Sequence, residues 1–430
     1  MRVAVVGAGI IGLASAYHLL KDGHEVVLVE AATPGVGASH GNAGWIVPAD
    51  CGPVAAPGVV FKSLKWMLRS DSPLYVKPSL RPDFVKFMLA MARRSNAADF
   101  RSALQANLGL AEGTMDLLDD YAADGISFEM HSEGLLCAFT DAEALAHHAA
   151  DNDILARHGI DPQVLTGEQV AEKEPALRPS LAGGLFYPNE RHLRPDQLVA
   201  GLARRCTDLG ATILTGTAVT AVRRDASGTI TALLTGTGPV VADQYLLAAG
   251  AHTGPLSALF GAPVPVRPGK GYSVDYSPAP AKLSAAVNLS DAKVAVTPLD
   301  GRLRLAGTME FAGLDTVVNP VRIAAIRQAP SSYFVEWDAG LVPEIGPWAG
   351  IRPMTPDGLP VMGRLPGVSN GWVAAGHGML GVTLGPGTGR AMAAAIGTGT
   401  APALMAPFDP RRFRNARGRA VSYPRPVAAR

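Results

Sequence analysis

Cysteine is scarce in this sequence, and the few cysteines are not arranged as a site. Only Cys51, Cys137 and Cys206 occur among 430 residues, without a Cys-x-x-Cys pair and without a histidine spaced to share a metal ion. Free cysteines are most often small, buried hydrophobic residues. We therefore expect no disulfide framework and no metal centre, and this usage fits a reduced, cytoplasmic compartment.

The sequence also lacks a dominant charge and a long apolar run. Its 38 basic and 37 acidic residues give a formal net charge of +1, so no global field attracts nucleic acid. No charge-free apolar stretch reaches the roughly 20 residues that cross a bilayer, and a strand pattern begins too early for a signal peptide. We expect a soluble cytoplasmic protein without a transmembrane segment or a nucleic-acid partner.

Hydrophobic residues are plentiful by contrast, at 48% of the chain, which is enough for a large core and more than one domain. The first 30 residues follow the patterns of a strand, a glycine turn, a helix and a second strand, at residues 2–6, 7–12, 13–22 and 25–30. This order predicts a βαβ unit.

The glycine turn of this unit has the sequence Gly7-Ala8-Gly9-Ile10-Ile11-Gly12, which fits G-x-G-x-x-G after a strand and at the start of a helix. The first glycine permits a tight turn, the second lets the backbone approach a pyrophosphate, and the third lets the helix pack on the strand. Glu30 ends the second strand, where a carboxylate accepts hydrogen bonds from an adenosine ribose and disfavours NADP. The motif leaves both NAD and FAD open.

The remaining sequence alternates between helical and strand patterns. Residues 39–58 are rich in Gly, Ala and Pro without a period, residues 59–150 are mostly helical, and residues 264–342 alternate as in an antiparallel sheet. A last helix is predicted at residues 389–396, after a glycine-dense stretch. We predict an α/β fold, in which a Rossmann-like dinucleotide-binding domain is joined to a discontinuous α+β substrate domain with an antiparallel sheet.

The domain boundaries are placed where these patterns change. We assign residues 1–58, 152–262 and 345–408 to the dinucleotide-binding domain, residues 59–151 and 263–344 to the substrate domain, and residues 409–430 to a basic tail. After Asp409 the tail carries seven arginines and no acidic residue. Such a run is usually a frayed, solvated end, and it can also attach to anionic lipid headgroups, which would place the protein peripherally at the inner face of the membrane.

Four further stretches combine small residues with single polar ones. They read GASHGNAG at residues 37–44, LLAAGA at 246–251, GIRP at 350–353 and GHG at 376–378. Together with the glycine turn, this ordered set resembles the FAD-dependent amino-acid oxidoreductases of the D-amino-acid oxidase, glycine oxidase and sarcosine oxidase group.

Within that group, the sequence is most similar to the bacterial D-amino-acid dehydrogenase type. The similarity rests on NAG at residues 42–44, APG at 56–58, KWM at 65–67 and above all RPMTPDGLP at 352–360. The resemblance covers nearly the whole chain.

The resemblance implies an extended FAD, with its pyrophosphate over Gly7, Gly9, Ile10, Ile11 and Gly12 and its adenosine at Glu30 and Val219. The flavin would lie among Ser39, His40, Asn42, Ala43, Gly44, Ala249, Gly250, Gly376, His377, Gly378, Met379 and Leu380. Backbone N–H groups of this last stretch would offset the negative charge of reduced flavin. Gly41 stands where some relatives carry a flavin-linked histidine, and no cysteine follows Cys206, so we expect non-covalent FAD.

The resemblance also points to substrate-binding residues. Arg352 matches the family position that holds the substrate carboxylate, and a guanidinium suits this role because it forms two parallel hydrogen bonds with a carboxylate. Tyr272 lies in a segment that the family places near the substrate or the flavin. Its hydroxyl either binds the carboxylate or belongs to a buried core tyrosine. We name Arg352 and Tyr272 as catalytic residues and assign no general base.

The implied reaction is the oxidative deamination of a small D-amino acid, in which a hydride leaves the α-carbon for flavin N5 and the imine hydrolyses to a 2-oxo acid and ammonia. The protein mainly orients the reactants. Electrons would pass to an acceptor other than oxygen, such as a quinone or a dye. Three alternatives stay open: an oxidase or dehydrogenase for glycine, sarcosine, D-proline or hydroxyproline; an NAD-dependent dehydrogenase; and a flavin-binding protein without turnover.

Overall fold

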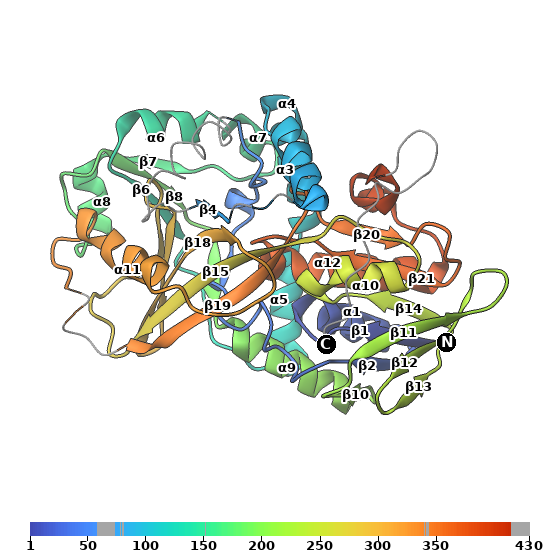
Figure 1. The fold of residues 1–430 in the computed structure, drawn as a ribbon. Coiled ribbons are helices and arrows are strands. Elements are labelled where there is room, and N and C mark those ends of the chain that lie inside the picture. Colours follow the sequence, from blue (N-terminus) through green and yellow to red (C-terminus); the bar gives the residue numbers. More distant parts are fainter. Residues whose placement is uncertain are drawn as a thin grey trace.

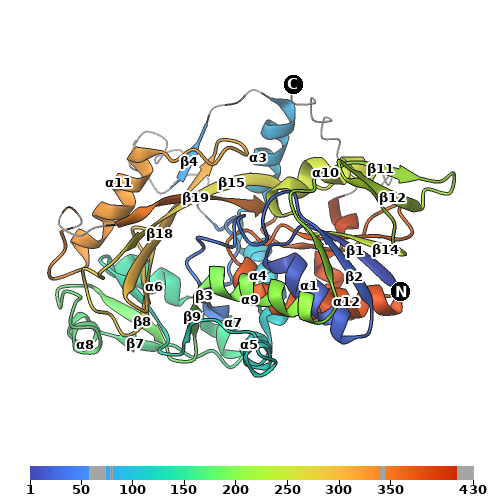
Figure 2. The ribbon, with the colours of Figure 1, turned by 90° about the horizontal axis from the view of Figure 1, so that it is seen from below.

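The computed structural model describes residues 1–57, 74–77, 79, 81–150, 152–338, 340 and 344–413 (Figure 1). The KWM stretch at residues 65–67 and most of the predicted basic tail lie outside these residues. Two large sheets lie side by side, one at each end of the molecule, in both views (Figures 1 and 2).

The first sheet has six strands in the order β10 (Thr212–Leu214), β2 (Glu25–Val29), β1 (Arg2–Val6), β14 (Gln244–Leu247), β21 (Gly371–Ala375) and β20 (Val361–Arg364). All neighbours are parallel except β20 and β21. The central strands β1 and β2 are near-continuous runs of Val, Ala and Leu, as expected where both faces of a parallel sheet are buried. The predicted βαβ opening is therefore present.

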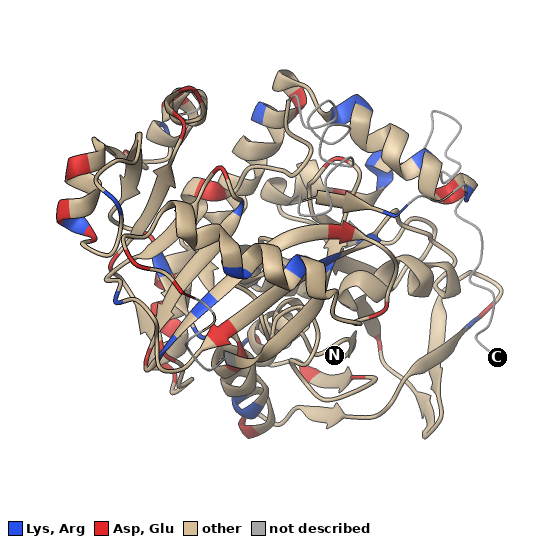
Figure 3. Ribbon diagram, turned by 60° about the vertical axis from the view of Figure 1, so that its left-hand side comes forward, with Lys and Arg blue, Asp and Glu red and all other residues tan. Residues whose placement is uncertain are grey.

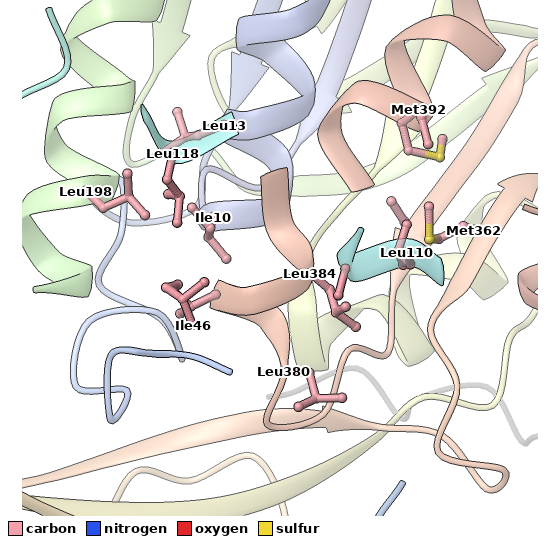
Figure 4. Packing of buried hydrophobic residues seen from close by; sticks show 14 of the residues in the cluster. Ile10, Leu13, Ile46, Leu110, Leu118, Leu198, Met362, Leu380, Leu384 and Met392 are labelled. Atoms are coloured by element: carbon pink, nitrogen blue, oxygen red, sulfur yellow. The ribbon is translucent and has the colours of Figure 1, made fainter. Parts of the chain in front are cut away.

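Helices cover one face of this sheet. The helix α1 (Ile10–Lys21) packs against α12 (Gly381–Thr398) and α9 (Pro195–Asp208). Ile10, Leu198 and Leu384, one from each helix, lie in a common cluster with Ile46 (Figure 4). The other face is covered by a small antiparallel sheet of β11 (Val219–Arg224), β12 (Ile230–Thr235) and β13 (Gly238–Val240).

The second large sheet has nine strands. Its main path is β19 (Glu344–Met354), β15 (Arg267–Tyr276), β18 (Arg302–Phe311), β17 (Val294–Leu299), β16 (Ala286–Leu289), β6 (Leu135–Phe139), β8 (Gly183–Tyr187) and β7 (Gln163–Leu165), and β4 (Leu74–Val76) pairs with β18. Most pairs are antiparallel, as predicted for residues 264–342. The helix α11 (Pro320–Gln328) covers one face of β15 and β18.

A third sheet links the two large ones. It has the strands β3 (Trp45–Ile46), β9 (Arg191–Leu193) and β5 (Met130–His131), all antiparallel. The remaining helices are α3 (Pro82–Arg94), α4 (Ala97–Ala111), α5 (Thr114–Ala123), α6 (Ala142–Ala149), α7 (Asn152–Ala156), α8 (Gly167–Lys173) and α10 (Thr253–Leu259).

The sheets do not follow the domain boundaries that the sequence suggested. The strands β7 and β8 lie after the boundary at 152, and all of β19 except its first residue lies after the boundary at 345, yet all three belong to the nine-stranded sheet. The segment 59–150 also contains the strands β4, β5 and β6 besides its helices. The strand β6 is buried along its whole length, so it shows an unbroken apolar run without the alternation that marks a half-exposed strand.

The helix α12 begins at Gly381, eight residues before the predicted start. Its glycines serve helix packing: a Cβ atom at Gly385 would lie 2.9 Å from Cγ1 of Ile10, and one at Gly389 would lie 2.6 Å from the backbone carbon of Ala14. The glycine-dense sequence therefore marks the close approach of two helices, α12 and α1, and not a loop.

Charged residues of both signs are interspersed over the molecule (Figure 3). No single helix among the described residues is long and apolar enough to cross a membrane. The helical segments Gly381–Thr398 and Ala403–Phe413 reach that length and apolar composition only together, and the chain bends by 103° between them.

Candidate active site

The loop between β1 and α1 presents backbone instead of side chains. Gly7 has a φ of 104°, and a Cβ atom there would lie 2.5 Å from the carbonyl oxygen of Ala248. A Cβ atom at Gly12 would lie 2.0 Å from the carbonyl oxygen of Gly7. At Gly9 the nearest atom would be the Ser39 hydroxyl, at 3.5 Å. Packing therefore requires the first and third glycines, and the second leaves the backbone open to a ligand.

Glu30 lies against this loop at the carboxyl ends of β1 and β2. Its carboxylate accepts hydrogen bonds from the backbone N–H groups of Ala8, at 2.7 Å, and Ala32, at 2.9 Å. Its own carbonyl accepts from the N–H of Thr217 at 2.8 Å, which brings the start of β11, with Val219, to the same edge. In open α/β sheets this edge is where nucleotides bind.

The predicted flavin loop, residues 39–44, connects the two large sheets. At one end, the Ser39 hydroxyl accepts a hydrogen bond of 3.2 Å from the N–H of Ile10 at the start of α1. At the other end, the carbonyl of Asn42 accepts from Arg304 and that of Ala43 accepts from Thr297, both at 2.8 Å. His40 is exposed. The loop is thus tied to β17 and β18 of the nine-stranded sheet.

Arg304 is itself held by a buried carboxylate. Its Nε and Nη2 donate to the two oxygens of Asp275 at 2.7 and 2.8 Å. Such a bidentate pair satisfies both charges and fixes the guanidinium plane. Arg304 therefore serves to position Asn42 of the flavin loop.

The second predicted flavin stretch, residues 376–380, lies at the N-terminus of α12. The N–H of Gly378 donates to the carbonyl of Pro353 at 3.0 Å, so this stretch touches the end of β19. Gly376 and Gly378 have φ angles of 81° and 56°, which glycine adopts without strain. Residues 376–380 line a narrow pocket together with residues 52–54 and part of the 354–358 segment.

His377 lies inside this stretch and is buried. Its Nε2 lies 3.0 Å from the Thr388 hydroxyl of α12. Burial lowers the pKa of His377 to about 3, so the imidazole is neutral and fixes the loop to the helix without adding charge.

The third predicted stretch, with Ala249 and Gly250, joins these parts. The Cβ position of Gly7 lies 3.0 Å from the Cα of Ala249. The short helix that follows, Gly250–His252, packs against β19 and β15. The structure therefore brings the predicted cofactor residues to one region, between the glycine loop and the strands β15 and β19.

Arg352 projects from β19 on the side of these loops. Its side chain crosses β15 over Gly271, where a Cβ atom would lie 2.2 Å from the guanidinium carbon. Its Nη1 donates to the carbonyl of Thr308 at 2.5 Å. Thr308 has a φ of 65°, and its bulge in β18 aims that carbonyl at the guanidinium.

The charge of Arg352 has no acidic partner among the residues that the structure describes. Burial lowers the pKa of its guanidinium to about 10. Arginine nevertheless keeps its charge at neutral pH, because its pKa starts so high. A buried cation of this kind is costly unless an anion pairs with it, so this guanidinium can bind an anionic ligand.

Trp348 is a neighbour of this site that the sequence motifs did not identify. A Cβ atom at Gly41 would lie 2.3 Å from its ring, and one at Gly350 would lie 1.9 Å from it. Trp348, Gly350 and Arg352 share one face of β19 because alternate residues of a strand do. That period of two, Trp-x-Gly-x-Arg, was the available signal in the sequence.

Tyr272, by contrast, does not lie with Arg352. It follows Gly271 on β15, so its side chain points to the opposite face of the sheet. There it is 1% exposed within a hydrophobic cluster, and its hydroxyl donates to Glu310 at 2.8 Å. Desolvation by burial, aided by this bond, raises the pKa of Tyr272 above its usual range. The structure therefore corrects the assignment of Tyr272 to the site and supports the buried-core interpretation.

A family model described as FAD dependent oxidoreductase (DAO) matches residues 2–395. The chain belongs to this family. A D-amino acid dehydrogenase of Cereibacter sphaeroides is 34% identical over 411 residues, covering 94% of this chain and 93% of that protein. Another, from Methylobacterium nodulans, is 36% identical over 421 residues, covering 94% and 97%.

Solved structures in the comparison have the same fold. Glycine oxidase from Geobacillus kaustophilus superposes with a TM-score of 0.73 at 27% identity, covering 96% of this chain and all of that one. L-proline dehydrogenase from P. horikoshii gives a TM-score of 0.75 at 19% identity, covering 97% and 98%. The second likeness concerns the fold alone.

FAD is the cofactor of this family, and the residues present fit it. The open backbone at Gly9 suits a pyrophosphate at a helix N-terminus. Glu30 lies at the strand ends where a ribose binds. The loops at residues 39–44 and 376–380 consist largely of small residues and backbone N–H groups.

Proposed function

We propose that the chain catalyses the oxidative deamination of a small D-amino acid and passes the electrons to an acceptor other than oxygen. The observation that carries this proposal is Arg352, a buried guanidinium without an acidic partner among the described residues, on the side of the predicted flavin loops. The naming of the curated relatives as D-amino acid dehydrogenases supports the substrate class.

Arg352 would bind the substrate carboxylate through two parallel hydrogen bonds. The carbonyl of Thr308 holds one guanidinium nitrogen in place, and Gly271 leaves the space that the side chain crosses. The remaining donors are free to face a ligand. When its carboxylate is held in this way, the amino acid can still rotate about the bond between the carboxylate carbon and the α-carbon. Further contacts would fix this rotation.

FAD supplies the hydride acceptor, and the resulting imine hydrolyses in water to a 2-oxo acid and ammonia. The chain contributes orientation, which can lower the barrier by several kcal/mol. Trp348 closes one end of the face that carries Arg352, so we expect it to limit the size of the substrate side chain.

We further propose that the six-stranded sheet with β11–β13 forms the cofactor-binding part and that the nine-stranded sheet forms the substrate part. The assignments of Glu30, Val219, the three flavin-loop stretches and Arg352 belong to the same proposal. The electron acceptor, a quinone or a dye-like molecule, is also part of this proposal.

Absorption spectra of the purified protein under anaerobic conditions test this function. The panel contains D-amino acids, their L-enantiomers, glycine, sarcosine and D-proline. Bleaching of the flavin bands by a small D-amino acid supports the proposal, whereas bleaching only by glycine, sarcosine or D-proline replaces the substrate class. Protein without flavin bands after reconstitution with FAD contradicts it.

Reoxidation of the bleached protein identifies the acceptor. We expect fast recovery of the flavin bands with a quinone or a dye and slow recovery with oxygen, and the reverse order would assign an oxidase.

Contact with a membrane surface through the arginine-rich residues 409–430 is part of the proposal as well. Cosedimentation with anionic vesicles, compared between the full chain and a chain ending at residue 413, tests it, because equal binding by the two would exclude residues 414–430, which carry five of the seven arginines.

A further inference from the structure

A group of metal-ligating side chains lies away from the proposed active site, in the third sheet. His131 on β5 and His192 on β9 are directly opposite each other in the antiparallel ladder. With Glu133, they offer three ligand atoms that all lie within 4.8 Å of one another. No sequence spacing reveals this group, because His192 comes about 60 residues after the other two along the chain.

His192 has a buried ring nitrogen without a hydrogen-bond partner, which indicates a place for a ligand. The side chain is 1% exposed, and its Nδ1 has no hydrogen-bond partner. The ring forms a hydrogen bond with the backbone of Pro298. Since proline has no N–H, this bond runs from the ring to the carbonyl, which places the proton on Nε2 and leaves the lone pair on Nδ1. A buried lone pair without a partner costs free energy unless a proton donor or a metal ion occupies it.

Each imidazole contacts a second polar group, as the rings of metal-bound histidines generally do. His192 donates to Pro298, and the Nε2 of His131 lies 2.9 Å from the Glu129 carboxylate. This carboxylate also accepts from the N–H of Asp300 at 2.8 Å, so its position is fixed.

The local charge also favours a cation. The carboxylates of Glu129, Glu133 and Asp300 lie close to the two rings, and Asp300 lies 3.8 Å from His131. Arg194 is the positive group that faces Glu129, at 3.9 Å. Two nitrogens and one carboxylate are the ligand types of a three-residue zinc site with a water molecule in the fourth position.

We propose that His131, His192 and Glu133 bind one divalent transition-metal ion, such as Zn²⁺ or Co²⁺. Ligands of one such ion lie about 3.3 Å apart when each bond is about 2.05 Å, so the group must contract slightly. The rings are stacked at 4.9 Å with 16° between their planes, and the partly exposed His131 ring must turn to point its nitrogen at the ion. Glu133 is exposed and free to move.

A bound ion would cross-link β5 to β9. The strand β9 also pairs with β3, where Trp45 lies opposite His192 and directly follows the predicted flavin loop. The carbonyl that orients His192 belongs to β17, whose Thr297 binds Ala43 of that loop. The ion would therefore stabilise the junction between the third sheet and the nine-stranded sheet.

The test uses tag-free, FAD-loaded protein that has been treated with a chelator and then titrated with Co²⁺. We expect one equivalent to bind, with visible absorption of a low-symmetry site, and Zn²⁺ to displace it because Zn²⁺ binds N/O sites more tightly. Failure of the wild-type protein to bind Co²⁺ or Zn²⁺ at micromolar concentration would overturn the proposal.

Matched variants locate the site. Glu133→Gln and His131→Gln change partly or fully exposed residues and should weaken Co²⁺ binding at least about 10-fold, and Glu129→Gln should weaken it roughly 10–100-fold through His131. The exposed residues Glu172 and His158 provide controls, Glu172→Gln and His158→Gln, that should bind as the wild type does. Equal binding by all five variants would place the ion elsewhere and contradict the proposal.

Discussion

The two faces of the sheet at β15 and β19 each carry a buried cation, but only one of these cations is paired with carboxylates. On the face toward the predicted flavin loops, Arg352 has no acidic partner among the described residues. On the face toward α11, the buried Lys270 donates to Asp315 at 2.7 Å and lies 3.8 Å from Glu310. A cation with its own carboxylates is structural, whereas a buried cation without one is available to a ligand.

Arg304 shows that the flavin-loop face can also carry a paired cation. Its bidentate contact with Asp275 leaves one nitrogen for the carbonyl of Asn42. The pairing of the charge, and not its location on one face or the other, therefore separates a positioning residue from a ligand-binding one.

Replacement of Arg352 should have the largest effect on activity. If it had none, the contrast between the unpaired Arg352 and the paired Lys270 would carry no functional meaning. For Arg352→Met, we expect kcat/KM to fall by about 10³-fold or more, because a charge-assisted bidentate contact with the substrate is lost. The midpoint of thermal unfolding should stay level or rise, since an unpaired buried charge is removed. Arg352→Lys should recover little activity. Burial lowers the pKa of a lysine ammonium group and so disfavours its charged form, and an ammonium group cannot form two parallel hydrogen bonds with a carboxylate. Unchanged kcat/KM in Arg352→Met would exclude the carboxylate role.

Gly271→Ala should give the second largest effect without altering any charge. The new methyl group would lie 2.2 Å from the guanidinium carbon of Arg352 and would displace it. We expect kcat/KM to fall about 10²-fold, as displacements near 1 Å can cause. Gly109→Ala in α4 is the control, because nothing lies within 4 Å of its Cβ position; it should keep wild-type kinetics and gain up to about 1 kcal/mol of stability. Wild-type kinetics in Gly271→Ala would mean that Arg352 does not bind substrate in this pose.

The two faces also mark how far sequence reasoning could go. The βαβ unit and Glu30 follow from local pattern and appear where expected, because a glycine turn and a strand end are set by residues close in the chain. Arg352 came from a resemblance, and its surroundings could not be predicted, since Thr308 and Gly271 reach it from other strands. Tyr272 was misplaced for the same reason: a one-residue step along β15 changes the face of the sheet.

Long-range strand pairing could not be predicted from the local patterns that set the domain boundaries. The strand β8 joins β6 across about 50 residues, and β19 joins β15 across about 80. Local composition does not record such partners. Trp348 was missed although its period of two with Arg352 was visible, because that signal becomes informative only when the strand is known to line a site.

Tyr272→Phe tests the structural role of the sheet face opposite Arg352. The variant leaves the buried carboxylate of Glu310 without the hydroxyl that donates to it at 2.8 Å. We expect a loss of about 1–3 kcal/mol in the free energy of unfolding, the cost of an unsatisfied buried acceptor, and less than a twofold change in kcat/KM. Chemical denaturation and steady-state kinetics measure the two effects separately. A large fall in kcat/KM with unchanged stability would return Tyr272 to the active site.

Asp315→Asn should give the smallest effect, because Asp315 is about half exposed and Glu310 remains near Lys270. We expect a loss of no more than about 1 kcal/mol at pH 7, typical of an ion pair in contact with solvent. The hydrogen bond from Lys270 holds the pKa of Asp315 below its usual 3.8, so this stabilisation is present above that pH and disappears as the pH falls through the lowered value. Wild type and variant should therefore differ in urea denaturation at pH 7 and converge at lower pH. A difference that grows in acid would show that Lys270 is balanced by another group, and the contrast between the two faces would then rest on Arg352 alone.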